Sequence, residues 1–153
     1  IKYTMKKANI SWLIKNDQNN YDLSYDYYLG NINGNEDTSI IIQVWNNYQG
    51  FEDAETIHDA KLILKTTSID DSYIFDYLTV RVNKATKKLI KYSDVKYGVQ
   101  IGTLSGLKNN GSETSQEALG NKNMCTIELI FNAIDFKVKE GLKHLVLDIE
   151  SNT

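Results

Sequence analysis

The most apolar run in the chain, Thr38 to Phe51, breaks abruptly into amides, a tyrosine and a glycine. Apolar side chains fill both faces of its first half, with Ile40, Ile42 and Val44 on one face and Ile41 and Trp45 on the other. A strand that is apolar on both faces lies near the middle of its sheet or is covered on both sides. The run therefore predicts a central β-strand, followed by an exposed loop rich in aromatic rings and amides.

Apolar residues recur at every second position along most of the chain, separated by stretches rich in Asn, Asp, Gly and Ser. A period of two is typical of strands, whose side chains alternate between two faces. It predicts strands in the segments Ala8–Lys15, Tyr21–Leu29, Ala60–Thr67, Tyr73–Val82, Leu89–Tyr92, Tyr97–Leu104, Cys125–Phe131 and Leu145–Ile149. Such closely spaced strands, with no long helix between them, predict one all-β domain over residues 1–153. We expect an antiparallel, Ig-like β-sandwich of about seven to nine strands.

The connections between these segments carry their own signals. Ser68–Asp71 and Asn83–Lys88 are polar and predict turns. Residues 51–59 fit either a loop or a short helical turn, because their acidic residues would suit a helix N-terminus. Gly106–Asn123 is the longest irregular stretch and has room for one helical turn at Glu113–Leu119. Loops of that length are usually functional or mobile, so we expect one long polar loop here.

Composition excludes several classes of partner. The formal charge is -3, with acids and bases mixed along the chain, and there is no basic stripe of the kind that binds nucleic acid. No apolar run approaches the roughly 20 residues of a membrane span, so membrane insertion is not expected. No secretory signal is visible behind the basic N-terminus. The chain starts at Ile1 without an initiator Met, which indicates processing, trimming or an origin inside a longer chain.

The residues that usually carry catalysis or bind metals are sparse. Cys125 is alone and flanked by strand-like residues, which predicts a buried thiol and no disulfide. His58 lies among acidic residues that could hold a cation, although a solvated loop explains it as well. The serine after Gly102-Thr103-Leu104 stands one place too late for a nucleophile elbow. We therefore expect no catalytic residues, no metal site and no cofactor.

A ligand-binding loop is the more specific expectation. Trp45, Asn46, Asn47 and Tyr48 place flat rings beside amides, and sugars pack their C–H faces on rings while their hydroxyls pair with amides. The alternative is that Trp45 belongs to the core and the amides form a turn. The tyrosines at positions 21, 25 and 27 share one face of their predicted strand, which suits a protein interface or a core.

Short strings along the chain resemble Ig-like β-sandwich domains of bacteriophage virion proteins and bacterial surface proteins. They are Ile10–Ile14, Tyr28–Ile32, Val44–Asn47, Ile101–Leu104 and the closing segment Gly141–Glu150. The resemblance implies a non-catalytic structural or adhesion module on a phage tail, baseplate or capsid surface, or on a bacterial cell surface. Such a module docks onto neighbouring protein subunits as a homo-oligomer or in many copies. The alternative function is a carbohydrate-binding module that uses the aromatic-amide loop to hold a surface glycan.

Overall fold

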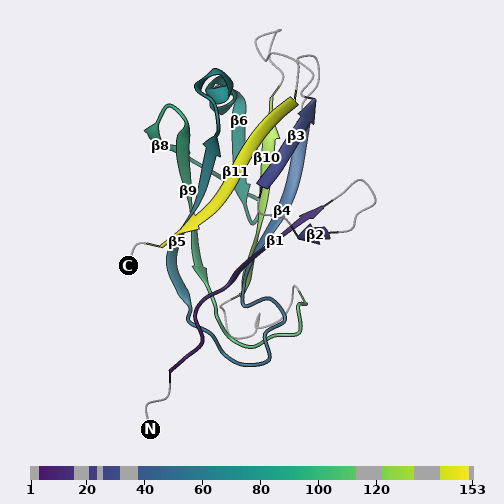
Figure 1. The fold of residues 1–153 in the computed structure, drawn as a ribbon, viewed down its shortest axis with the longest axis vertical. Coiled ribbons are helices and arrows are strands. Elements are labelled where there is room, and N and C mark those ends of the chain that lie inside the picture. Colours follow the sequence, from purple (N-terminus) through teal and green to yellow (C-terminus); the bar gives the residue numbers. More distant parts are fainter. Residues whose placement is uncertain are drawn as a thin grey trace.

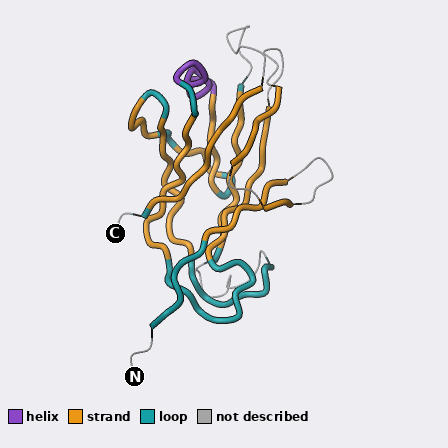
Figure 2. The backbone as a smooth tube through the Cα atoms, viewed as in Figure 1, coloured by secondary structure: helices purple, strands orange, loops and turns teal. Residues whose placement is uncertain are grey.

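The computed structural model describes residues 4–15, 21–23, 26–31, 38–112, 122–132 and 142–151. Their strands form two antiparallel sheets that face each other (Figures 1 and 2). The six-stranded sheet runs in the order β2 (Tyr21–Leu23), β1 (Ile10–Lys15), β4 (Thr38–Asn46), β10 (Met124–Phe131), β6 (Leu78–Val82) and β7 (Ala85–Lys87). The five-stranded sheet runs β3 (Asp26–Asn31), β11 (Leu142–Glu150), β5 (Ile57–Thr66), β9 (Lys96–Leu104) and β8 (Ile90–Ser93).

The predicted all-β antiparallel sandwich is confirmed. The short strands β2 and β7 lie at the two edges of the six-stranded sheet, and the expected count did not include them as separate strands. Connectivity within the sandwich is that of a jelly roll, with the orders β4-β10-β6-β7 and β3-β11-β5-β9. An immunoglobulin domain instead has strands A, B, E and D in one sheet and strands C, F and G in the other. The expected Ig-like character therefore extends to the two-layer architecture and not to the connectivity.

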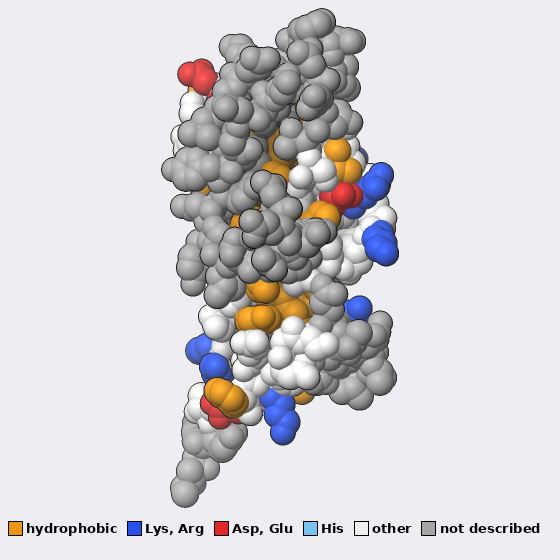
Figure 3. Space-filling view, turned by 90° about the vertical axis from the view of Figure 1, so that its right-hand side faces the viewer, with side chains coloured by type: hydrophobic (Ala, Val, Ile, Leu, Met, Phe, Trp, Pro, Cys, Tyr) orange, Lys and Arg blue, Asp and Glu red, His pale blue; other side chains and the backbone are white. Residues whose placement is uncertain are grey.

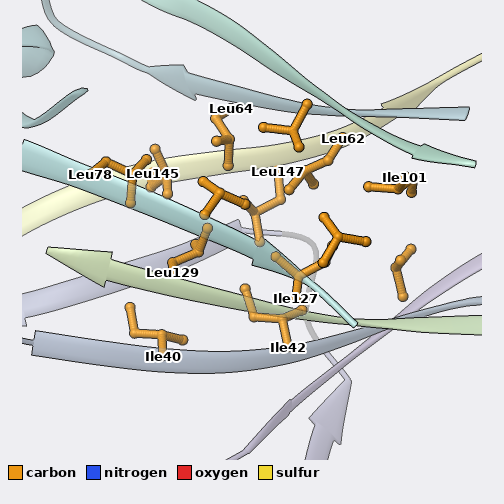
Figure 4. Close-up of a cluster of buried hydrophobic side chains, with 14 of the residues drawn as sticks. Ile40, Ile42, Leu62, Leu64, Leu78, Ile101, Ile127, Leu129, Leu145 and Leu147 are labelled. Carbon is orange, nitrogen blue, oxygen red and sulfur yellow. The ribbon is translucent and has the colours of Figure 1, made fainter. Parts of the chain in front are cut away.

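The core between the sheets is built by the alternating faces that the sequence shows. β4 pairs with β1 on one side and with β10 on the other, which confirms its predicted central place. Aliphatic side chains from both sheets meet in the interior (Figure 4). The four inward residues predicted for β10 are all buried, namely Cys125, Ile127, Leu129 and Phe131.

Two predicted strands are corrected. Instead of a strand from Tyr73 to Val82, the chain forms a 3₁₀ helix, η1 (Ile69–Tyr77), before β6 begins at Leu78. The Ser68 hydroxyl accepts a hydrogen bond from the backbone N–H of Asp70 at 3.1 Å and caps the helix. Ile74 and Phe75 are adjacent and both buried, which a two-faced strand with one exposed side cannot achieve.

The segment Tyr21–Leu29 is not one strand, because β2 belongs to the six-stranded sheet and β3 to the five-stranded sheet. Residues 51–56 form a loop, so of the two alternatives for residues 51–59, a loop or a short helical turn, the loop is correct. β5 begins at Ile57, three residues earlier than predicted, through an irregular stretch in which Asp59 has a φ of 49°. Asn83 and Lys84 form the tight turn between β6 and β7, both with positive φ.

Other expectations lie outside the described residues. They concern the helical turn at Glu113–Leu119 and the side chains of the tyrosines at 21, 25 and 27.

Candidate functional site

The connections after β4 and β9 lie together at one end of the sandwich, the end nearer the N-terminus (Figures 1 and 2). We call residues 47–56 and 105–112 the loop end. Main-chain hydrogen bonds join its two segments: the N–H of Ala54 donates to the Gly106 carbonyl at 2.7 Å, and the N–H of Asn109 donates to the Gly50 carbonyl at 3.2 Å. The four predicted ligand-binding residues lie at this end, where β4 runs into the first loop.

Trp45 is buried, with 1% of its surface exposed, on the face of β4 opposite the main core. Its indole Nε1 donates to Oε1 of Gln43 at 3.1 Å. Leu13 and Met124 pack against it, and the Tyr48 ring meets it edge to face with centroids 4.9 Å apart. Trp45 therefore lies in a small second hydrophobic core with Leu13 and Met124, and it offers no free ring face to a ligand.

Asn46 is fully buried, and its side-chain amide is used within the protein. Its Nδ2 donates to the carbonyls of Glu55 at 2.9 Å and Leu104 at 3.1 Å. Its Oδ1 accepts the backbone N–H of Asn9 at 3.1 Å. This one side chain therefore ties together the N-terminal segment, the first loop and the end of β9.

Asn47 is also buried, and its Nδ2 donates to the carbonyls of Glu52 at 2.8 Å and Gly106 at 2.9 Å. Its backbone is left-handed, with a φ of 57°, which asparagine tolerates better than most residues. Position 50 requires glycine, because a Cβ there would lie 2.1 Å from the Oδ1 of Asn47. The structure therefore brings the predicted residues together but buries the Trp45 ring and both amides, and leaves Tyr48 half-buried against Trp45.

Two asparagines that the sequence reasoning did not single out complete this network. Nδ2 of Asn109 donates to the Asn47 carbonyl at 2.7 Å, and its Oδ1 accepts the N–H of Gln49 at 3.0 Å. Nδ2 of Asn123 donates to the carbonyls of Ser105 and Leu107 at 2.8 and 2.7 Å. Their signal in the sequence was the density of asparagine in both connections, since amide side chains can replace backbone partners in a turn.

Phe51 is the outward counterpart of this buried network. Its side chain is 100% exposed, and the side chains of Glu52 and Asp53 next to it are exposed too. A carboxylate oxygen of Asp53 accepts the backbone N–H of Lys108 at 2.9 Å, which fixes this part of the loop. Gln49 holds a φ of 55°, a conformation uncommon for glutamine. The loop is thus held in one shape, with a phenyl ring displayed beside carboxylates.

A second feature lies on the outer face of the six-stranded sheet. A pocket of about 270 Å³ is lined by Ile41, Arg81, Lys84, Thr126 and Glu128. Arg81 and Glu128, which are paired neighbours on β6 and β10, form an ion pair at 3.6 Å in this lining. We call this the outer-face pocket. On the face drawn in Figure 3, the described Lys and Arg side chains are scattered rather than gathered into a stripe.

His58 is exposed and lines a wider hollow of about 480 Å³ with Met5, Glu55 and Thr56. Among the described residues, no group of three or more His, Cys, Asp and Glu side chains is placed to hold a metal ion. Cys125 is a buried free thiol, as predicted, and burial raises its pKa to about 12. Such a thiol is a poor nucleophile at neutral pH because almost none of it is ionised.

Comparison with models of known protein families, with curated proteins and with solved structures finds no match for this chain. In the described part of the chain, no helix has the length and apolar character needed to cross a membrane.

Proposed function

We propose that this chain is a non-catalytic structural and adhesion module of a bacteriophage virion. In this role it docks onto neighbouring subunits at a tail, baseplate or capsid surface and presents its loops outward. The observation that carries the proposal is the construction of the loop end. Its buried asparagines bind its own backbone, and Phe51 is left wholly exposed.

A loop held in this way suits docking for an energetic reason. Ordering a flexible loop on binding costs conformational free energy, and a loop that is already fixed avoids most of that cost. Burying a phenylalanine side chain contributes about 1.5–3 kcal/mol. Phe51 is not buried within the chain, so this free energy becomes available when a partner buries its side chain. Jelly rolls occur in viral capsid and lectin domains, although a fold alone does not determine a function.

The proposal is tested by finding the protein in its natural assembly. Particles purified from the source should contain the chain in many copies, and chemical cross-links to other subunits should map to residues 47–56 and 105–112. A chain recovered only as a free monomer that joins no larger assembly would overturn the proposal. Recovery on cells rather than particles would move the same docking role to a bacterial surface.

The alternative, glycan binding through Trp45, Asn46, Asn47 and Tyr48, has less support from the geometry. The Trp45 ring and both asparagine side chains are buried, and their polar groups are already bonded within the protein. A glycan array decides between the roles. If the docking role is right, no glycan on the array should depend on Trp45. Glycan binding that Trp45→Ala abolishes, in a variant that is still folded, would favour the carbohydrate-binding module.

A further inference from the structure

We propose that the docking partner of the loop end is a second copy of this chain, with Phe51 of one copy inserted into the outer-face pocket of the next. The inference rests on the proposed docking function and names its partner. It joins two features of the molecule: an exposed ring on the loop after β4 and a pocket on the outer face of the six-stranded sheet.

The size of the pocket fits the ring. A cavity of about 150 Å³ is enough to hold a benzene molecule in a protein interior. The outer-face pocket measures about 270 Å³, and Ile41 of β4 gives it an apolar contribution. Ile41 is only partly buried in the isolated chain, so an inserted ring would cover apolar surface on both partners.

The charges around the two features are complementary. Glu52 and Asp53 flank Phe51 with exposed carboxylates. Arg81 and Lys84 contribute cations to the pocket lining. Glu128 is the acid among the lining residues, and it already pairs with Arg81 at 3.6 Å and accepts a hydrogen bond from Ser39 at 3.2 Å. We call Phe51 with its two flanking carboxylates the knob. A knob that enters this pocket meets the cationic groups of Arg81 and Lys84, which favours this orientation over others.

Both features are fixed before they meet. The knob is held by the asparagine network, and the pocket lies on three paired strands, β4, β10 and β6. Because a knob and a pocket are different surfaces, the contact is heterologous. Contacts of this kind build rings where the rotation closes and open filaments where it does not, both of which suit a multi-copy component.

Sedimentation of the purified chain over a range of concentrations measures this contact. We expect the average mass to rise above that of the monomer as concentration increases. Phe51→Ala should weaken self-association at least ~30-fold, as for a central interface residue. Ile69→Ala is the matched control, because it removes an exposed apolar side chain from η1 and should leave association unchanged.

Charge reversal tests the orientation. Lys84→Glu and Glu52→Lys should each weaken association several-fold, and more strongly at low salt. Copies carrying the first change should bind copies carrying the second better than either binds itself, because the opposite charges then face each other again. Equal weakening in that mixture would contradict the assignment of the pocket.

The sharpest test mixes two variants that cannot assemble alone. Phe51→Ala keeps its pocket but lacks the knob, and Ile41→Trp keeps its knob while filling the pocket. Each should sediment as a monomer, and an equimolar mixture should form a complex of one copy of each and nothing larger. Circular dichroism confirms that both variants are folded.

Wild-type protein that stays monomeric at every concentration, or a mixture with no complex, overturns the self-contact. That result leaves the proposed function standing if particle cross-links still map to the loop end. Absence of the chain from particles, together with intact self-association, removes the virion role instead.

Discussion

Phe51 and Tyr92 are both exposed aromatic residues, but the fold accounts for only one of them. Tyr92 of β8 is 44% exposed, and its ring covers Gly98 of the neighbouring strand so closely that a Cβ there would lie 2.6 Å from it. The ammonium groups of Lys61 and Lys96 lie 5.7 and 5.6 Å from the ring centroid. An aromatic ring laid over a cross-strand glycine restores the packing that the glycine lacks.

Phe51 has no comparable role, because its whole side chain is exposed on a loop fixed by other residues. Exposure alone therefore does not mark a functional residue. The informative feature is an exposed ring whose removal should not disturb the structure that displays it. The difference between the two rings can be tested by substitutions in the scaffold and in the rings themselves.

The largest effect is expected at the scaffold. Gly106→Ala places a Cβ 2.1 Å from the backbone carbonyl oxygen of Ala54, which cannot move aside cheaply. We expect the free energy of unfolding to fall by about 3 kcal/mol, measured by urea denaturation. The matched control is Gly102→Ala. The φ of Gly102 is 84°, but a Cβ added there would meet no atom within 4 Å, so the free energy of unfolding should fall by only about 1 kcal/mol. Equal losses would mean that close packing does not hold the loop end.

Asn47 separates the hydrogen bonds of the scaffold from its backbone shape. Asn47→Ala removes the donor of two hydrogen bonds, to the carbonyls of Glu52 and Gly106, although Gly106 still accepts the N–H of Ala54. We expect a loss of about 2 kcal/mol in the free energy of unfolding. Asn47→Gly loses the same bonds but suits the φ of 57°, so it should be less destabilising. If neither substitution changed the urea midpoint, the network would contribute nothing to stability.

The two rings give the direct contrast. Tyr92→Ala uncovers Gly98 and should lower the free energy of unfolding by about 1–2 kcal/mol. Phe51→Ala should change it by less than about 0.5 kcal/mol, as for an ordinary surface position. Thermal unfolding of both variants measures this difference. A clear destabilisation by Phe51→Ala would give that ring a structural role and remove the contrast.

The smallest effect is expected at Cys125 near neutral pH. Burial raises the thiol pKa from 9.0 to about 12, so the folded protein should react with a disulfide reagent only as fast as it unfolds. The unfolded chain releases this proton at a lower pH than the folded chain does. Stability should therefore decline as pH rises above about 9 and continue to fall towards 12. Cys125→Ser should flatten that part of the profile, and fast labelling of native protein at pH 8 would contradict burial.

The sequence correctly predicted the strands that have one apolar and one polar face, and those that are apolar on both faces. β4 and β10 are the clearest cases, because their side chains alternate between the core and the outer face without interruption. The segment around Ile74 and Phe75 misled the same reasoning. Aromatic and β-branched residues favour strands, but here a capped 3₁₀ turn buries two adjacent side chains.

The candidate site was predictable in position but not in orientation. Residues after Trp45 do form a loop rich in amides and aromatic rings, as the change of composition indicated. Asn47 and Gly106, however, meet across 59 positions of sequence, and Asn47 and Asn109 across 62. A single sequence carries no record of such distant pairs, so it cannot tell an amide that binds a ligand from one that binds the backbone. Only the fold showed that Phe51, and not Trp45, is the fully exposed aromatic residue of this region.

Amide hydrogen exchange at the loop end tests the central claim, that a fixed scaffold displays Phe51. The N–H groups of Gln49, Gly50 and Ala54 each donate to an acceptor within the network. We predict that they exchange nearly as slowly as the paired amides of β4. The bonds of Gln49 and Ala54 cross between the two loops and open only when the loops separate, and Gly50 donates to the Asn47 carbonyl, which Asn109 of the other loop also holds. Exchange at the fast rate of an open loop, with β4 still protected, would contradict the account.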